Sequence, residues 1–106
     1  MSTFSVDLNR FSTYGLSMLS PEQSRAARGW LEWSQEDLAQ RANLSLSTVR
    51  DFEKGRRTPI KNNIDAMERA LSASGIEFVA YPDGRPAGII VKNIAERPML
   101  ITTDNA

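Results

Sequence analysis

The feature that most constrains the fold is a pair of short helical segments between Ser34 and Gly55. The pattern predicts one helix from Gln35 to about Ala42 and a second over about residues 46–54, joined by a tight turn. Apolar residues at helical spacing form one shared seam across both segments: Leu38, Ala42, Val49 and Phe52. Helices this short cannot bury such a seam alone. Further helices of the same chain must therefore complete the core.

Two flanking helices are predicted. The first begins with Ser20 as a cap, Pro21 at the first helical position and Gln23 three residues after the cap. Its apolar residues are Ala26, Ala27, Trp30 and Leu31. The last helix shows the clearest helical period and stops at Gly75, and its apolar residues are Ile60, Ile64, Met67 and Leu71.

After Gly75 the pattern changes to two β-prone runs, 76–81 and 87–91. The segment between them, 82–86, contains two prolines, an aspartate and a glycine, which is typical of a turn. The expected fold class is therefore mainly α, with a four-helix core followed by a C-terminal β-hairpin. The expected organisation is an N-terminal extension that is flexible or pairs weakly (1–19), a helical domain (20–75), the hairpin (76–92) and a tail (93–106).

Composition excludes several classes of function. The 106 residues include no cysteine and no histidine, which removes thiolate metal sites and the usual general base. No convergent pair of acids supports a carboxylate enzyme, so we expect no enzymatic activity, metal or cofactor. No apolar run approaches the roughly 20 residues of a membrane helix, and the N-terminus lacks the pattern of a secretory signal. A cytoplasmic protein without a membrane partner is the expectation.

Residues 20–75 resemble the Cro/repressor-type helix-turn-helix domains, also called the XRE family. The resemblance is carried by three stretches: Trp33-Ser34-Gln35-Glu36-Asp37-Leu38-Ala39, Leu44-Ser45-Leu46-Ser47-Thr48-Val49, and Phe52-Glu53-Lys54-Gly55-Arg56-Arg57-Thr58-Pro59. It implies a small helical DNA-binding domain that represses or regulates transcription, usually as a dimer. The family's fifth helix would fall after Gly75, where this chain predicts a hairpin instead.

The second short helix can be divided into faces without the family. At about 100° per residue, Val49 and Phe52 define the core direction. The outward face then carries Ser47, Arg50, Asp51 and Lys54, with Leu46, Thr48 and Glu53 on the flanks. Such groups suit a major groove, where arginine donates to guanine and aspartate accepts from cytosine. The expected base-reading residues are Leu46, Ser47, Arg50 and Asp51; the alternative is an ordinary solvated face.

Basic residues are concentrated locally although the net charge is zero. Between Leu38 and Lys61 there are six basic residues against two acidic ones: Arg41, Arg50, Lys54, Arg56, Arg57 and Lys61 against Asp51 and Glu53. This charge lies where a phosphate backbone would pass. The expected phosphate contacts are Gln35, Ser45, Thr48, Lys54, Arg56 and Arg57, with Gln35 assigned from the resemblance. The alternative is that Arg56 and Arg57 only aid solubility.

Two structural roles are also expected. The resemblance implies an ion pair between Arg28 and Glu53, which would make Glu53 structural. A palindromic DNA site needs two copies of the domain, and the hairpin supplies apolar surface for dimerisation. The expected dimerisation residues are Phe78, Tyr81, Ile89, Ile90 and Val91. The alternative is a hairpin that folds back onto the last helix of a monomer.

The leading functional hypothesis is a sequence-specific transcriptional repressor that binds double-stranded DNA at a palindromic operator as a homodimer. The second is an antitoxin-type protein that regulates its own promoter and binds a partner toxin through residues 1–17 or 93–106. A scaffold used only for protein contact is disfavoured by Arg50, Arg56 and Arg57. The operator and any small protein partner stay open.

Overall fold

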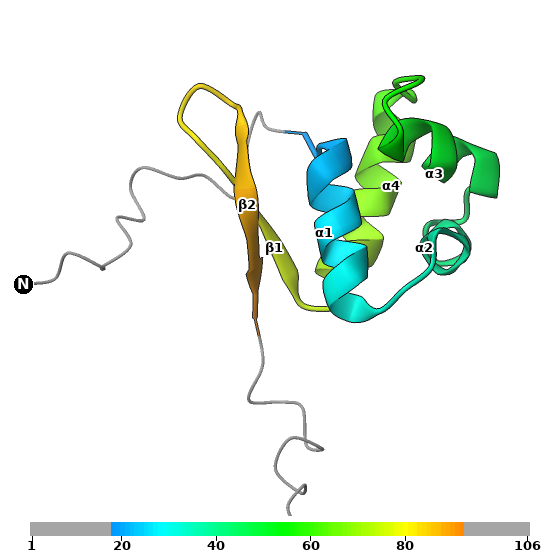
Figure 1. Ribbon diagram of the computed structural model, residues 1–106, viewed down its shortest axis with the longest axis horizontal. Coiled ribbons are helices and arrows are strands. Elements are labelled where there is room, and N and C mark those ends of the chain that lie inside the picture. Colours follow the sequence, from blue (N-terminus) through cyan, green and yellow to red (C-terminus); the bar gives the residue numbers. More distant parts are fainter. Residues whose placement is uncertain (1–17, 93–106) are drawn as a thin grey trace, which may run out of the picture.

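The computed structural model describes residues 18–92, so the expectations for residues 1–17 and 93–106 lie outside the described part of the chain. Within that part, four helices are followed by two strands (Figure 1). The elements are α1 (Pro21–Leu31), α2 (Gln35–Ala42), α3 (Leu46–Glu53), α4 (Lys61–Ser72), β1 (Ile76–Ala80) and β2 (Pro86–Val91). The predicted fold class, a mainly α core with a C-terminal hairpin, is confirmed.

Serine caps fix where the first three helices begin. The Ser20 hydroxyl accepts a hydrogen bond from the Gln23 backbone, and the Gln23 side chain accepts one from the Ser20 backbone, each at 3.1 Å. Ser34 and Asp37 form the same reciprocal pair at α2, and Ser45 caps α3. These bonds satisfy first-turn N–H groups that have no partner within the helix. Short helices thereby acquire defined starting points.

The apolar core lies where α2, α3 and α4 meet. All predicted seam residues are buried: Leu38, Ala42, Val49 and Phe52. Helix α4 adds Ile64, Met67 and Leu71, and each such side chain stabilises the fold by roughly 1.5–3 kcal/mol. The prediction that Ile60 belongs to this stripe is wrong. Ile60 is the N-cap of α4 and is 67% exposed, because the helix begins only at Lys61.

Helix α1, in contrast, buries a largely polar face. Its buried residues are Gln23, Ser24 and Ala27. The predicted apolar stripe is wrong for Ala26 and Trp30, which are exposed. Leu19, which the sequence assigned to the extension, is buried in the core. Helix α1 packs against both α3 and β2, and its polar residues bond to groups on α3 and on both strands of the hairpin.

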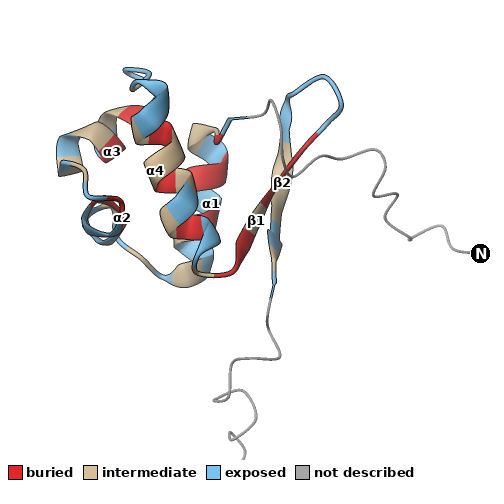
Figure 2. Cartoon of the chain, turned by 180° about the vertical axis from the view of Figure 1, so that it is seen from behind, coloured by how far each residue is buried: buried red, intermediate tan, exposed pale blue. Residues whose placement is uncertain are grey.

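The hairpin is antiparallel, with Ile76 opposite Val91 and Phe78 opposite Ile89. These four side chains pack against the helical core. Helices α1 and α4 lie between the hairpin and the α2–α3 pair, so the hairpin and α3 occupy opposite ends of the molecule (Figures 1 and 2). The register shifts between Val79 and Ala80, which is a β-bulge.

The Gln23 side chain joins α1 to the hairpin at this bulge. Its Nε2 donates to the carbonyl oxygens of Val79 and Gly88, each at 3.0 Å, while its Oε1 accepts from Ser20. Both donor hydrogens and the acceptor of the buried amide are therefore used. Because Val79 and Gly88 lie opposite each other on the two strands, one side chain holds both strands against the helix.

Candidate nucleic-acid interface

Helix α3 lies at the end of the molecule opposite the hairpin (Figure 1), and its exposed residues are polar. Val49, Phe52 and Glu53 bury its inner side. Ser47, Arg50 and Lys54 are exposed on the outer side, as the division into faces predicted. Asp51, which was expected on the outer face, is instead half-buried, like the flank residues Leu46 and Thr48. The outer face thus offers hydroxyl and cationic groups to solvent.

Three hydroxyl groups gather at the first turn of α3. The Ser45 Oγ accepts from the Thr48 backbone N–H at 3.2 Å and lies 2.8 Å from the Thr48 hydroxyl. The Ser47 hydroxyl is 3.2 Å from the Ser45 Oγ. Ser45 and Thr48 are therefore engaged in the cap, whereas Ser47 is exposed and its backbone and side chain form no part of the N-cap bond. The start of a helix favours negative charge, so this cluster suits a phosphate or a base edge.

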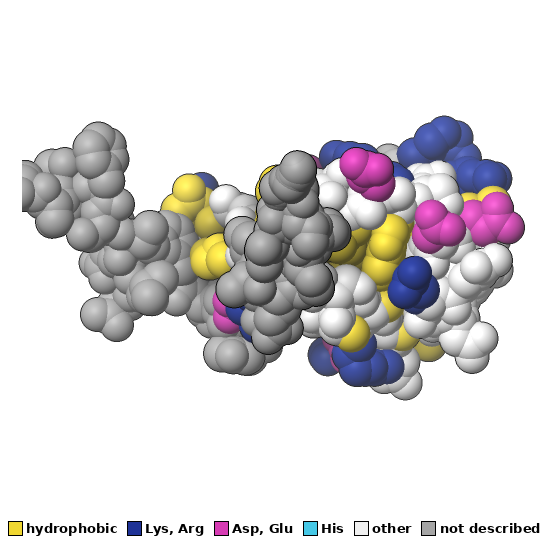
Figure 3. Space-filling view, turned by 90° about the horizontal axis from the view of Figure 1, so that it is seen from below, with side chains coloured by type: hydrophobic (Ala, Val, Ile, Leu, Met, Phe, Trp, Pro, Cys, Tyr) yellow, Lys and Arg dark blue, Asp and Glu magenta, His cyan; other side chains and the backbone are white. Residues whose placement is uncertain are grey.

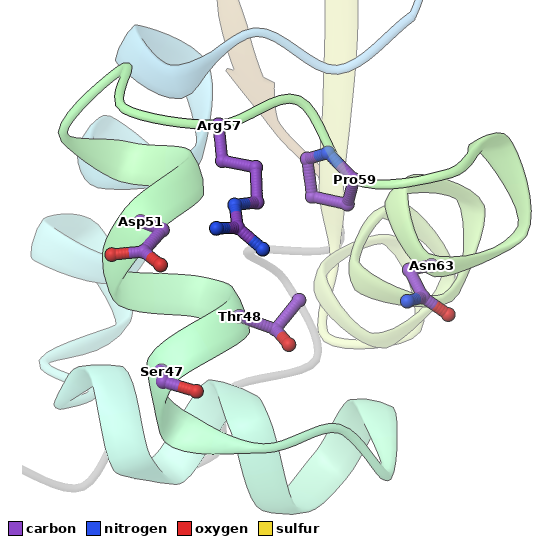
Figure 4. A pocket seen from close by; sticks show the side chains of 6 residues that line it. All are labelled: Ser47, Thr48, Asp51, Arg57, Pro59 and Asn63. Atoms are coloured by element: carbon purple, nitrogen blue, oxygen red, sulfur yellow. The ribbon is translucent and has the colours of Figure 1, made fainter.

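A groove of about 220 Å³ runs between α3 and the start of α4. It is lined by Ser47, Thr48, Asp51, Arg57, Pro59 and Asn63. Figure 4 shows the Arg57 side chain reaching from the loop into the space between the two helices, with Asp51 and Thr48 on the α3 side. Asn63 comes from α4, on the other side of the groove. Sequence reasoning missed Pro59 and Asn63, because only their position directly after the basic loop connects them to this surface.

The basic residues of this region divide into paired and unpaired sets. The paired set is Arg56 with Asp51 at 3.7 Å, Lys61 with Asp65 at 2.8 Å, and Arg41 over the Trp33 ring at 4.3 Å. Among residues 18–92, no acidic partner lies within ion-pair distance of Arg50, Lys54 or Arg57. Figure 3 shows basic side chains, interspersed with acidic ones, at the α2–α3 end of the molecule. The unpaired cations are free to meet an anion.

Glu53, the last residue of α3, is a buried carboxylate with partners from α1 and α2. Arg28 bonds to both oxygens, with its Nη2 2.6 Å from Oε1 and its Nε 2.9 Å from Oε2. The Ser24 hydroxyl donates to Oε2 at 2.5 Å, and the Gln35 amide donates to Oε1 at 3.1 Å. Arg25 donates to the Glu53 backbone carbonyl. We call Glu53, Arg28, Ser24 and Gln35 the Glu53 cluster; it fixes the end of α3 against the two preceding helices.

The Glu53 cluster sets the ionisation of its central carboxyl. Burial alone would raise the pKa of Glu53. Hydrogen bonds from Arg28, Ser24 and Gln35, together with the charge of Arg28, outweigh that effect and hold the pKa below its ordinary value. Glu53 is therefore a charged structural residue at neutral pH.

Comparison with known proteins identifies this arrangement. A model of the helix-turn-helix family matches residues 25–78, which include α2, α3, α4 and most of α1. The chain belongs to the helix-turn-helix family. At the level of the family it is a DNA-binding transcription regulator, and the resemblance to Cro/repressor (XRE) domains is confirmed.

This helix-turn-helix protein is also similar to multiprotein-bridging factor 1 of Schizosaccharomyces pombe. The two are 38% identical over 78 residues, which cover 73% of this chain and 49% of the yeast protein. The chain thus spans about half the length of this relative.

The helix-turn-helix motif consists of α2 and α3, and the expected DNA contacts lie on or beside it. The expected base-reading residues lie together along α3: Leu46, Ser47, Arg50 and Asp51. Lys54, Arg56 and Arg57 follow in the exposed loop. Gln35 is half-buried and already donates one amide hydrogen to Glu53, a bond that the sequence did not indicate. Its other amide hydrogen and its oxygen make no hydrogen bond within residues 18–92.

The residues expected to dimerise are divided by the fold. Phe78, Ile89 and Val91 pack against the helices of their own chain. Tyr81 and Ile90 are each 39% exposed and are the members of the set that face solvent. Within residues 18–92, no cluster of acidic side chains could hold a metal ion, and no helix has the length and apolar character needed to cross a bilayer.

Proposed function

We propose that this protein is a transcriptional repressor that binds a palindromic operator as a homodimer, with α3 in the major groove. The observation that carries the proposal is the outer face of α3, where exposed hydroxyl and arginine groups adjoin a loop in which Lys54 and Arg57 have no acidic partner among residues 18–92. Arg50 is long, exposed and without an acidic partner in the described part of the chain, so it can donate two hydrogen bonds to one guanine. Ser47 and Leu46 contact neighbouring bases from the first turn.

Asp51 has a second role in this proposal. Its carboxylate lies 3.7 Å from the Arg56 guanidinium, and Arg57 shares the same groove. An exposed pair of this kind contributes at most about 1 kcal/mol, so Arg56 can exchange Asp51 for a phosphate. Asp51 then accepts from a cytosine or rejects sites that lack one. Lys54, Arg56, Arg57, Ser45, Thr48 and Gln35 bind the backbone.

The test compares two arginines after in-vitro selection has supplied the preferred DNA site. Arg50→Ala should cost about 1–3 kcal/mol on that site and relax preference at one base pair. Arg57→Ala should weaken binding to all DNA alike and lower the salt slope by about one unit. Arg69→Ala, an exposed arginine in the last turn of α4, is the matched control and should change neither quantity. Unaltered sequence preference in Arg50→Ala would contradict the proposed recognition surface.

The alternative is an antitoxin-type protein that regulates its own promoter and binds a toxin. The segments on which it depends, 1–17 and 93–106, lie outside the described residues. The name of the yeast relative, a bridging factor, keeps protein contact open for this chain as well. Stoichiometric co-purification of a second small protein from the native host would favour this alternative over a self-sufficient repressor.

A further inference from the structure

The backbone pattern of the hairpin shows which groups point outward from β2. The Lys92 N–H donates to the Gly75 carbonyl at 2.7 Å, so this pair is a hydrogen-bonded pair of the ladder. In an antiparallel ladder hydrogen-bonded and non-hydrogen-bonded pairs alternate. Glu77–Ile90 is therefore hydrogen-bonded, whereas the pairs made by Ile89 and Val91 are not. The N–H and C=O groups of Ile89 and Val91 thus point away from β1, along the outer edge, and have no partner within residues 18–92.

The two strands differ in how far they are covered. Four of the five β1 residues are buried, whereas no residue of β2 is. Figure 2 shows this contrast along the hairpin. Natural sheets protect an open edge with charged residues, prolines or bulges. In β2, Pro86 and the bulge at Ala87 protect only the end next to the turn, and residues 88–91 carry neither charge nor proline. Within residues 18–92, the edge formed by residues 88–91 is therefore accessible and unprotected.

We infer that β2 pairs edge to edge with β2 of a second copy of this chain, antiparallel about a two-fold axis at Ile90. The inference rests on the proposed homodimer and specifies its interface. Ile89 of each copy exchanges N–H···O=C bonds with Val91 of the other, and the two hairpins join into one continuous sheet. No charged side chain within β2 opposes its own copy across this pairing.

The position of the axis follows from the side chains. At an axis through Ile90, the two exposed isoleucines meet in a close, non-hydrogen-bonded pair and cover each other. An axis through Ile89 would instead set Ile90 opposite Gly88, which has no side chain. It would also pair Val91 of one copy with Ala87 of the other. Ala87 has no partner in β1 because it lies in the bulge. The Ile90 axis uses only regular strand.

The absence of cysteine in the natural chain makes a direct test simple, because Ile90→Cys supplies the sole thiol. Directly opposed residues of a non-hydrogen-bonded pair have Cα atoms about 4.5 Å apart, within the range of a disulfide. Mild oxidation of the full-length variant should therefore give a covalent dimer on a non-reducing gel. Tyr81→Cys is the matched control, because Tyr81 is equally exposed but lies at the hairpin tip, far from the axis. Equal cross-linking of both variants, or none in Ile90→Cys while sedimentation shows a dimer, would overturn the inference.

A second variant separates the interface from DNA binding. Ile90→Lys places like charges across the axis and should weaken dimerisation by about tenfold or more, with an unchanged far-ultraviolet spectrum. Its affinity for a single half-site should equal that of the wild type, while its affinity for the full palindrome should fall. An unchanged dimer constant in Ile90→Lys would overturn the β2 interface. A chain that cross-links through Ile90→Cys but binds no half-site would support the interface and overturn the proposed repressor.

Discussion

Helices α1 and α4 lie side by side between the hairpin and α3, yet they bury opposite kinds of surface. Helix α4 buries Ile64, Met67 and Leu71. Helix α1 buries two polar side chains, Gln23 and Ser24, and their bonds extend to the hairpin and to α3 respectively. The apolar face stabilises the fold without direction, in proportion to the area it covers. Burying the polar face costs desolvation free energy, which its hydrogen bonds offset, and these bonds fix the orientation of the neighbouring elements.

The difference shows how the molecule separates stability from positioning. The two elements proposed for function, α3 and the hairpin, are both oriented by polar contacts to α1. The Glu53 cluster holds the end of α3, and Gln23 holds the two strands at the bulge. Polar contacts require defined distances and angles, so they specify where a neighbour sits. Variants in the two faces should therefore differ in kind as well as in size.

The largest effect is expected from Glu53→Gln, which keeps the shape of the side chain but leaves Arg28 without its counter-charge. Breaking a buried pair on one side costs on the order of 3–5 kcal/mol. Because folding lowers the pKa of Glu53, the stability that its charge supplies is fully present above the ordinary value of 4.5 and is lost as the pH falls through the folded pKa. The gap between wild type and variant, measured by urea denaturation, should narrow on acidification.

Met67→Ala is the comparison from the apolar face. It should lower the free energy of unfolding by about 2–5 kcal/mol. This loss should stay the same over the pH range in which Glu53 ionises. If both variants showed the same pH dependence, the assignment of that dependence to the Glu53 cluster would fail. A double-mutant cycle between Arg28 and Glu53 should in addition give a clear coupling energy.

A middle-sized effect is expected from Gln23→Leu. It leaves the carbonyls of Val79 and Gly88 without their side-chain donor, at a cost of about 1–3 kcal/mol, and should speed hydrogen exchange in the hairpin. Ser20→Ala is the control, because it removes the Ser20 hydroxyl cap and leaves the Gln23 amide on the strands. If exchange in the hairpin rose equally in both variants, Gln23 would act only as a helix cap.

The smallest effect is expected from Glu68→Gln in α4. Partial burial, and next the charge of Asp65, raise the pKa of Glu68, against the opposing effect of Lys61. Because the pKa of Glu68 is raised in the folded state, ionisation of Glu68 lowers the free energy of unfolding of the protein as the pH rises through that pKa. The variant should therefore be more stable than wild type at pH 7, by less than about 1 kcal/mol given solvent screening. The gain should disappear in acid, and a destabilised variant at pH 7 would show that the carboxylate has a favourable partner.

Local signals were enough to predict that four helices form and where the first three begin. Ser20, Ser34 and Ser45 mark helix starts, and Asn43 marks a stop with φ 60°. These signals act within one turn, so the sequence carries them without reference to the fold. The chain reversal at Glu32, also left-handed with φ 59°, had no such signal, because glutamate rarely adopts that conformation.

The candidate site was predictable where it follows the period of one helix. The exposure of Ser47, Arg50 and Lys54 follows from the positions of Val49 and Phe52. The groove residues contributed by other segments were not predictable in this way. Asn63 reaches the groove only because the loop after α3 brings the start of α4 to the other side of it (Figure 4).

The sequence by itself determined the number and kind of elements, the apolar seam and the outer face of α3, because caps and periodicity are local properties. Only the tertiary structure decided that α1 buries a polar face and that Gln23 bonds to strands more than fifty residues away along the chain. It also decided that Phe78, Ile89 and Val91 face the helices while Ile90 faces solvent. A buried polar group is stable only when its partners are present. The partners of Gln23 and Glu53 come from distant parts of the chain, and no local pattern reports them.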